Sequence, residues 1–355
     1  MPVIILIVVL AVAAVCAAVF FAVRAYKHRK LAEQLDKRDD DQVHYAFVIN
    51  PSKPQAEQCK QHIQEFCEAK HLTQVEYIGT QLDKDGRACA LEALEHGADV
   101  VVAVGGDGTV RTVASAVSGT GHALGIIPIG TGNDFLKNFG SDMEKFRDAE
   151  NLWNGPQFPI DAIQVNDRIA LTIACSGIDA RVAKDVHKFS ESPILDGKSS
   201  YIVSLAVNFL FKGIGTHWTV TLDGVSVEKD YAVVAVCNGR YYGGGFMPVA
   251  EARMDDGVLN TLVVDKVSRS TFLKFVGPYS RGEYHRFPHL AHCSTAKDIV
   301  IDSEKKDIVT CLDGECVTTD HVHIRLADKK LNFFGPDGCS CNATAREAAP
   351  AVEQM

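Results

Sequence analysis

The sequence predicts two domains, a first α/β domain built on a parallel sheet and a mostly β second domain, preceded by one amino-terminal transmembrane helix. Apolar strand-like runs alternate with helical patterns across residues 45–127, and this alternation is typical of an α/β domain with parallel strands. After about residue 160 short β-type runs predominate, whereas residues 1–23 carry no charged side chain. The length of 355 residues suits two domains better than one.

Residues 3–23 form one uninterrupted apolar segment. A helix of roughly 20 residues spans about 30 Å, which is the hydrocarbon thickness of a bilayer. Four basic residues follow between positions 24 and 30, and no acid precedes Glu33. Because positive flanks favour the cytoplasmic side, we expect a single-pass anchor in the cell membrane with the body of the chain in the cytoplasm. The alternative is a cleaved secretory signal, which would have a basic leading region and a shorter apolar run.

The first domain is expected at residues 45–160, after a charged linker at residues 24–44. Gly97 stands just past the end of one helical pattern, where glycine commonly ends a helix. The wholly apolar run at residues 100–104 is typical of a buried parallel strand. The expected strands are residues 45–50, 75–78, 100–104 and 123–127, and the expected helices are residues 55–70, 85–96 and 110–118.

The second domain is expected at residues 161–324, and about residues 325–335 are a candidate for rejoining the first domain. Helical patterns remain at residues 179–189 and 199–211. The small, polar tail at residues 336–355 is expected to be disordered. The expected strands of this domain are residues 169–175, 218–222, 231–237, 259–264, 299–301 and 321–326.

Composition excludes several classes of protein. With 46% apolar and 23% charged residues, the chain is not a disordered segment, a coiled coil or a collagen-like fibre. The formal net charge is −9, from 36 basic and 45 acidic residues, and an acidic body argues against nucleic acid as a partner. Eleven cysteines, an odd number that falls largely in apolar patterns, indicate reduced thiols in a cytoplasmic protein.

Two groups of metal-binding residue types are weaker candidates. Cys339 and Cys341 in the tail could bind a metal or respond to redox state, but without a second pair we interpret them as inert. His285, His289 and His292 have spacings of four and three, which is conceivable for zinc. Pro288 would interrupt a helix through them, and the HExxH pattern of zinc enzymes is absent from the sequence, so we do not favour a zinc site.

The strongest local motif is a glycine-rich turn, Gly105-Gly106-Asp107-Gly108-Thr109, between an apolar strand and a helix. Glycines let the backbone approach a ligand closely, and the amides at the start of the helix attract anions. This arrangement suits a nucleotide phosphate, and Asp107 adds a carboxylate where a phosphate-bound metal could be held. The motif matches neither GxxxxGK[ST] nor GxGxxG.

Two further loops follow strands of the same expected sheet. One is Gly130-Thr131-Gly132-Asn133-Asp134-Phe135, and the other begins at Asn50-Pro51-Ser52. The carboxyl ends of parallel strands lie at one edge of a sheet, and ligands bind there. A simple capping turn is the alternative for the first of these loops.

The order of these three motifs resembles the diacylglycerol kinase catalytic-domain family, which includes bacterial lipid kinases and sphingosine kinases. Residues 237–245, 255–259 and 312–315 are similar to that family's later glycine-rich, DDGxL and DGE segments, so the likeness covers residues 45–334. GGDGT alone is shared with NAD kinases and phosphofructokinases, and the first domain is expected to have their fold. The ordered set of motifs is much more specific. Taken alone, Asp255-Asp256 and Asp313-Gly314 would also suit exposed β-turns.

The resemblance implies an enzyme that uses ATP and Mg²⁺. It implies that Asp256, with the backbone of Arg253 and Val258, helps to hold Mg²⁺, and that Glu315 is the general base. An alcohol acceptor must lose a proton as phosphorus is attacked, so a nearby carboxylate is useful, whereas the transfer itself needs mainly positioning and charge neutralisation. Glu315 and Asp107 are therefore the expected catalytic residues. The expected ATP-site residues are Asn50, Thr80, Gly105, Gly106, Asp107, Gly108, Thr109, Val110, Arg111, Thr112, Thr131 and Asn133.

The sequence departs from the family's pattern in two places. Lys53-Pro54 stands in the first loop where the family more often has glycine, and Pro54 has no amide hydrogen to offer a phosphate. Arg111-Thr112 stands where Asn-Glu often follows GGDGT. Arg111 could bring positive charge to the nucleotide, whereas the missing acid could alter metal binding.

These observations predict an ATP-dependent lipid kinase that acts on the hydroxyl of a membrane lipid. Diacylglycerol is the leading expected acceptor, and its product would be phosphatidate. A membrane anchor would raise the effective concentration of such an acceptor. The alternatives are an NAD kinase-like or sphingosine-type kinase and an inactive membrane-anchored protein that binds nucleotide or lipid.

Overall fold

The computed structural model describes residues 43–153, 155–190, 213–339 and 341. The predicted transmembrane anchor, almost all of the predicted linker and the predicted helix at residues 199–211 lie outside these residues. Within the part of the chain that the structure describes, no helix is long and apolar enough to cross a bilayer.

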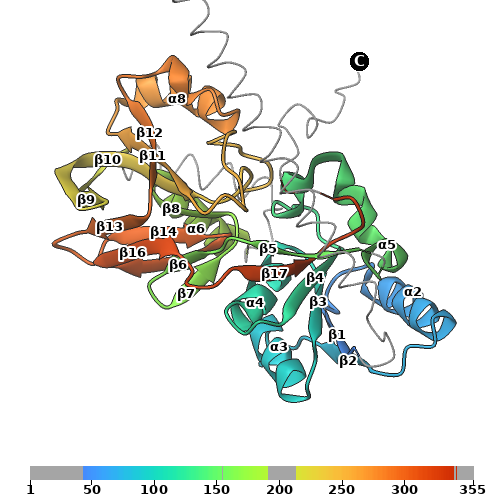
Figure 1. The fold of residues 1–355 in the computed structure, drawn as a ribbon. Helices are drawn as coiled ribbons and strands as arrows, with labels where there is room; N and C mark the ends of the chain where they lie inside the picture. Colours follow the sequence, from blue (N-terminus) through green and yellow to red (C-terminus); the bar gives the residue numbers. More distant parts are fainter. Residues whose placement is uncertain (1–42, 154, 191–212, 340, 342–355) are drawn as a thin grey trace, which may run out of the picture.

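A six-stranded sheet forms the centre of the first domain, in the order β2-β1-β3-β4-β17-β5. All neighbouring strands run parallel except β5, which is antiparallel to β17. Strand β17 comes from the end of the chain and completes the first domain after the second one has been built (Figure 1). The strands are β1 (Tyr45–Ile49), β2 (Val75–Gly79), β3 (Val100–Gly105), β4 (Ala123–Pro128), β5 (Gln157–Ile160) and β17 (Leu331–Phe334).

Helices cover both faces of this sheet because side chains alternate along its strands. In β1, Ala46 and Val48 pack into the cluster under α3 and α4, whereas Phe47 and Ile49 pack into the cluster under α2 and α5. Asp85 caps α3 by accepting a hydrogen bond from the backbone N–H of Ala88 at 2.9 Å. These elements are α2 (Ala56–Ala69), α3 (Gly86–Glu95), α4 (Asp107–Val117), the 3₁₀ segment η2 (Leu136–Arg147) and α5 (Ala149–Trp153).

The second domain is an eleven-stranded, mostly antiparallel sheet with helices packed on it. Its long strand β10 pairs with β9 through residues 225–231 and then with both β8 and β11 through residues 233–237. The strands are β6 (Ile163–Val165), β7 (Arg168–Ala170), β8 (Ile173–Gly177), β9 (Thr216–Leu222), β10 (Val225–Cys237), β11 (Leu259–Asp265), β12 (Ala291–Ala296), β13 (Asp298–Asp302), β14 (Ile308–Leu312), β15 (Glu315–Thr319) and β16 (His321–Leu326), and the helices are α6 (Ile178–Ser190), α8 (Arg269–Ser280) and η4 (Tyr284–Arg286).

Three local expectations need correction. The strand expected at residues 169–175 is two strands, β7 and β8, because the backbone around Thr172 turns to bond a distant carboxylate. The helix expected from residue 110 already begins at Asp107, so the last three residues of the GGDGT motif belong to the first turn of α4. In the tail that was expected to be disordered, Cys341 is buried in the core of the first domain and Cys339 packs against that core. Residues 342–355 lie outside the described part.

Candidate active site

Two of the three predicted loops, those after β1 and β3, meet the end of β2 at one edge of the first sheet. The backbone N–H of Asn50 donates to the carbonyl of Val104 at 3.0 Å, and its side-chain amide donates to Thr109 Oγ1 at 3.2 Å. Thr80, at the end of β2, donates its backbone N–H to the carbonyl of Ile49 at 2.9 Å. The loops after β1, β2 and β3 are thus joined by direct hydrogen bonds.

Glycines allow the loops after β3 and β4 to touch. A Cβ on Gly130 would lie 2.5 Å from the Cα of Gly106, and a Cβ on Gly132 would overlap the carboxylate of Asp107. No side chain larger than hydrogen fits between these backbones. The glycines of both motifs therefore allow the two backbones to approach closely. A phosphate-binding loop also needs such freedom of approach.

Asp107 fixes the second loop against the first. Its Oδ2 accepts the backbone N–H of Asn133 at 2.8 Å, and its Oδ1 accepts the backbone N–H of Asp134 at 2.7 Å. Burial, followed by the nearby charge of Asp134, raises the pKa of Asp107 above its ordinary value. Both carboxylate oxygens are thus already engaged in shaping the site.

Two of the predicted nucleotide-binding residues have other roles in the structure. Asn133 is buried in a left-handed conformation with φ of 52°, and its side-chain amide donates to the carbonyl of Gly130 at 3.0 Å. The hydroxyl of Thr112 bonds to carbonyls of its own helix and lies against Gly86 of α3, away from the loops. Thr131 is exposed at the tip of its loop.

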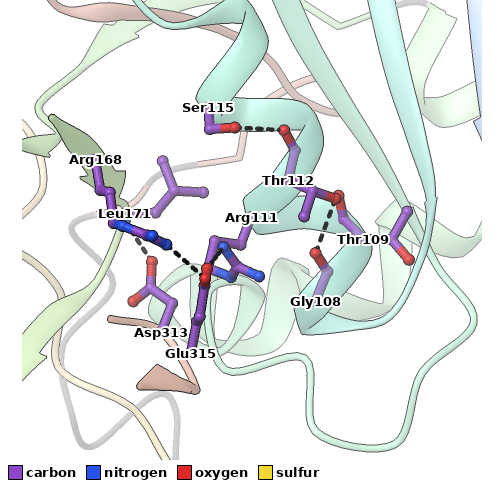
Figure 2. Close-up of polar contacts among 9 residues, drawn as sticks. All are labelled: Gly108, Thr109, Arg111, Thr112, Ser115, Arg168, Leu171, Asp313 and Glu315. Atoms are coloured by element: carbon purple, nitrogen blue, oxygen red, sulfur yellow. Dashed lines mark hydrogen bonds and ion pairs between the residues drawn. The ribbon is translucent and has the colours of Figure 1, made fainter. Parts of the chain in front are cut away.

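Glu315, the first residue of β15, is held by two arginines from different parts of the chain. Arg111 of α4 pairs with its Oε2, and Arg168 of β7 pairs with its Oε1 at 2.6 Å. Figure 2 shows both guanidinium groups converging on this carboxylate. The side chain of Glu315 remains 34% exposed, so a substrate group can still reach it.

Asp313 positions Glu315 by anchoring the turn between β14 and β15. Its half-buried carboxylate accepts the backbone N–H groups of Thr172 and Ile173 at 3.1 and 3.0 Å. It also bonds to the amide of Leu171 (Figure 2). Burial raises the pKa of Asp313. Asp313 has a φ of 44° and Gly314 a φ of 95°, which is the pairing of a tight type I′ hairpin turn. Asp313 is therefore a positioning residue.

A cavity of about 220 Å³ lies between the two domains at this point. The first domain contributes Asp107, Arg111 and Asp134, and the second contributes Asp313 and the loop that follows Tyr242. The backbone N–H of Gly244 donates to Oδ2 of Asp134 at 2.7 Å, which ties the glycine-rich loop of the second domain to the GTGND loop of the first. Residues that the sequence separates by more than a hundred positions thus enclose one space.

Lys53, one of the departures from the family's pattern, is a further candidate site residue. Its side chain reaches the GGDGT turn, where Cε would lie 3.8 Å from a Cβ placed on Gly106. Lys53 also lines an open cavity of about 420 Å³ with Lys60 and Tyr77, beside the carboxyl ends of β1 and β2. No described residue forms an ion pair with Lys53. A lysine in place of the family's glycine was the signal available in the sequence.

The predicted metal residues lie apart from this cavity. Asp256 accepts the backbone N–H of Val258 at 3.1 Å, and burial together with the nearby Asp161 and Asp255 raises its pKa. Asp161 is itself buried, bonds to the N–H of Gly257 at 2.8 Å and pairs with Lys330 at 2.8 Å. One carboxylate crowded by others suits a cation held mainly by backbone carbonyls and water. Across the described ranges, no group of three or more His, Cys, Asp or Glu side chains is arranged to hold a metal.

Comparison with known proteins identifies both halves of the chain. Residues 44–165 match the model of the diacylglycerol kinase catalytic domain, and residues 172–335 match that of the YegS C-terminal NAD kinase beta sandwich-like domain. The chain is also similar in fold to a solved diacylglycerol kinase from Bacillus anthracis strain Sterne, with a TM-score of 0.60 and 20% identity over 82% of this chain and 96% of that one.

Curated relatives carry matching names. The "probable lipid kinase YegS-like" of Pseudomonas putida is 32% identical over 188 residues, which is 51% of this chain and 60% of the relative. The "diacylglycerol kinase" of Bacillus subtilis is 27% identical over 261 residues, which is 69% of this chain and 84% of the relative. The match to the Pseudomonas relative thus spans less than two thirds of that protein's length.

Proposed function

Because the chain belongs to the diacylglycerol kinase catalytic-domain family, we propose that it is an ATP-dependent lipid kinase that phosphorylates the hydroxyl of a membrane lipid. Diacylglycerol, which would give phosphatidate, is the acceptor that we propose. The observation that carries the proposal is that residues of the GGDGT and GTGND loops and the Asp313-Gly314 turn enclose one cavity between the domains. Glu315, the next residue, pairs with Arg111 at the wall of this cavity.

The nucleotide phosphates would lie against the start of α4. Gly106 precedes that helix, and the free amides of its first turn favour an anion there. Lys53 and Arg111 lie on two sides of this turn and would add positive charge to it. Phosphoryl transfer depends chiefly on such positioning and charge stabilisation.

Glu315 would take the proton of the acceptor hydroxyl. A carboxylate has about four sites that accept hydrogen bonds, so it can meet a hydroxyl while it keeps an arginine. Arg111, which lines the cavity and pairs with Glu315, stands between the acceptor base and the phosphate end of the site. We propose that its guanidinium holds Glu315 in place and also stabilises the negative charge on the transferred phosphoryl group.

We propose that Mg²⁺ is held at Asp256 and at the backbone carbonyls of Arg253 and Val258, as the family resemblance implies. Burial, with the nearby carboxylates of Asp161 and Asp255, disfavours the charged form of Asp256, and a cation there would stabilise that form. Because Asp256 does not line the cavity between the domains, we propose that an ion held there shapes the second domain. A magnesium ion bound with ATP would supply charge neutralisation at the phosphates.

The test of this function is a transfer assay. Purified full-length protein with Mg²⁺ and γ-labelled ATP is expected to label a lipid-soluble product in vesicles that contain diacylglycerol. Label found only on NAD would identify an NAD kinase instead. Bound ATP without transfer to any lipid of a panel would favour the inactive binding protein.

Lys53 provides a prediction about ATP alone. Lys53→Met should raise KM for ATP about three- to tenfold, because a partly exposed ammonium contributes modestly to phosphate binding. The increase should shrink at high salt, since salt screens this contact in the wild type. Lys70→Met is the matched control, because Lys70 pairs with Glu150 at the far end of α2. An unchanged KM in the Lys53 variant would exclude the contact.

We also propose that residues 3–23 anchor the protein in the cell membrane with its body in the cytoplasm. The uncharged segment and the four basic residues that follow it support this proposal. Full-length protein should stay in the membrane pellet after an alkaline carbonate wash. Release into the supernatant would contradict the anchor.

A further inference from the structure

A second cavity, of about 100 Å³, lies in the second domain next to the candidate active site. The two cavities share Tyr242, Gly243 and Gly314, so one ends where the other begins. The smaller cavity lies under helices α6 and α8, and apolar side chains make up most of its wall. These include Ile178, Val182, Val233, Phe246, Phe272 and Phe275.

Asp179 is the single carboxylate among the residues that line this apolar cavity. Its Oδ2 accepts hydrogen bonds from the hydroxyls of Tyr242, at 2.5 Å, and Tyr279, at 2.7 Å. Those hydroxyls are also 3.0 Å from each other. Asp179 therefore holds Tyr242, the side chain that stands between the two cavities.

The other oxygen of Asp179 differs from Oδ2. Among the described residues, none donates a hydrogen bond to Oδ1. Oδ1 is not among the buried, unpartnered oxygens of the described residues, so it is open to water or to a ligand. Burial raises the pKa of Asp179, so a hydrogen-bond donor on a ligand would stabilise its charged form. The two tyrosines account for Oδ2 and leave Oδ1 for a molecule in the cavity.

We propose that this cavity binds the part of the acceptor lipid next to its reacting hydroxyl, and that Oδ1 of Asp179 accepts a hydrogen bond from a second donor on that lipid, a hydroxyl or an amine. The inference rests on the proposed lipid kinase function and revises its acceptor, because it favours a lipid with a second donor over the diacylglycerol proposed first. The cavity is too small for two long chains, so its occupant is the proximal portion of one chain with its polar neighbour. We expect a higher kcat/KM for acceptors with a second donor than for diacylglycerol. The other two oxygens of diacylglycerol are esterified and cannot donate a hydrogen bond.

The experiment compares kcat/KM for three acceptors in the full-length protein, with Mg-ATP and mixed vesicles: 1-monooleoylglycerol, dioleoylglycerol and sphingosine. Asp179→Asn has the same shape, but with its carbonyl oxygen bonded to the tyrosines its amide N–H groups replace Oδ1. The ratio of monooleoylglycerol to dioleoylglycerol activity should then fall about tenfold, the effect of losing one hydrogen bond to a charged group. Sphingosine has both an amine and a further hydroxyl beside its reacting hydroxyl, so a similar fall in its ratio shows that the contact extends beyond a glycerol backbone, and an unchanged ratio restricts the contact to glycerol lipids.

Tyr279→Phe is the control, because it removes one bond to Oδ2 and leaves Oδ1 untouched, so the ratio should stay within about twofold. Equal losses on both acceptors in Asp179→Asn would mean that Asp179 only supports the fold, which overturns the proposal. A larger loss on dioleoylglycerol would mean that Asp179 donates to an ester, which also overturns it. If wild-type protein labels no lipid, the proposed function fails, and this inference fails with it.

A modified acceptor lipid tests the proposed hydrogen bond even if Asp179→Asn does not fold. Methylation of the second hydroxyl of monooleoylglycerol removes the donor and leaves the reacting hydroxyl intact. Wild-type kcat/KM should fall about tenfold on this methyl ether. Equal activity on the two compounds would overturn the proposal.

Discussion

Replacement of Glu315 by Gln should lower the rate of phosphoryl transfer by about a hundredfold or more, the usual contribution of a positioned general base. The glutamine side chain keeps the size of glutamate, and its carbonyl oxygen can still accept a bond from Arg111 or Arg168. It cannot take a proton from the acceptor hydroxyl. Because the ion pairs of Glu315 are partly exposed, their loss should cost the fold little.

The measurement is single-turnover transfer to lipid, with thermal unfolding followed in parallel. Arg168→Gln is the matched control, because Arg168 also contacts Glu315 but does not line the cavity. That variant should keep its rate within about tenfold of wild type, since one hydrogen bond to a charged group is at stake. A Glu315→Gln enzyme with near-normal turnover would remove Glu315 from the proton transfer.

The loops of the site could be predicted from the sequence because each one is a local pattern. Three glycines and an acid at the end of a buried strand identify the GGDGT turn without knowledge of any distant residue. The strand and helix alternation across residues 45–127 is likewise local, and the structure places a strand or helix at each of its positions. The GTGND loop follows the same rule, since β4 ends just before it.

The pairings within the site could not be predicted in the same way. Arg111 and Arg168 meet Glu315 across 204 and 147 residues, and neither has a local feature that indicates this partner. The break between β7 and β8 depends on the carboxylate of Asp313, so periodicity within residues 169–175 could not show it. In the sequence Asp179 is an ordinary residue of a helical pattern. Its hydrogen bonds to Tyr242 and Tyr279 are known only from the structure.

Short strands were missed for a related reason. Strands β14 and β15 flank the Asp313-Gly314 turn with five residues each, and their alternation is too brief to separate from a loop. Strand β15 pairs with β14, and β14 joins the sheet through β8, which is far away in the sequence. The hairpin that contains Glu315 therefore forms through pairing with a distant strand. In the sequence, only its turn residues Asp313 and Gly314 indicated it.

Replacement of Asp107 by Asn should lower kcat/KM for ATP by about a hundredfold, the scale of loss that follows when a reacting group is misplaced by about 1 Å. In the wild type both oxygens of Asp107 accept backbone N–H groups, one from Asn133 and one from Asp134. Asparagine has a single acceptor oxygen, so its amide group would face one of these N–H groups as donor against donor. The GTGND loop would then lose its register against the GGDGT turn.

Asp85→Asn is the control for Asp107→Asn. Asp85 caps α3 through the N–H of Ala88, and Asn is an equally good cap, so activity and unfolding temperature should both stay near wild type. Asp107→Asn should cost about 1–3 kcal/mol of stability, from the N–H group that it leaves without an acceptor. Its loss of activity should exceed that cost, because the loop it misplaces binds the nucleotide. Retention of wild-type ATP kinetics in the folded variant would show that the two loops keep their register without Asp107, and the nucleotide site would then have to be placed elsewhere along this sheet edge.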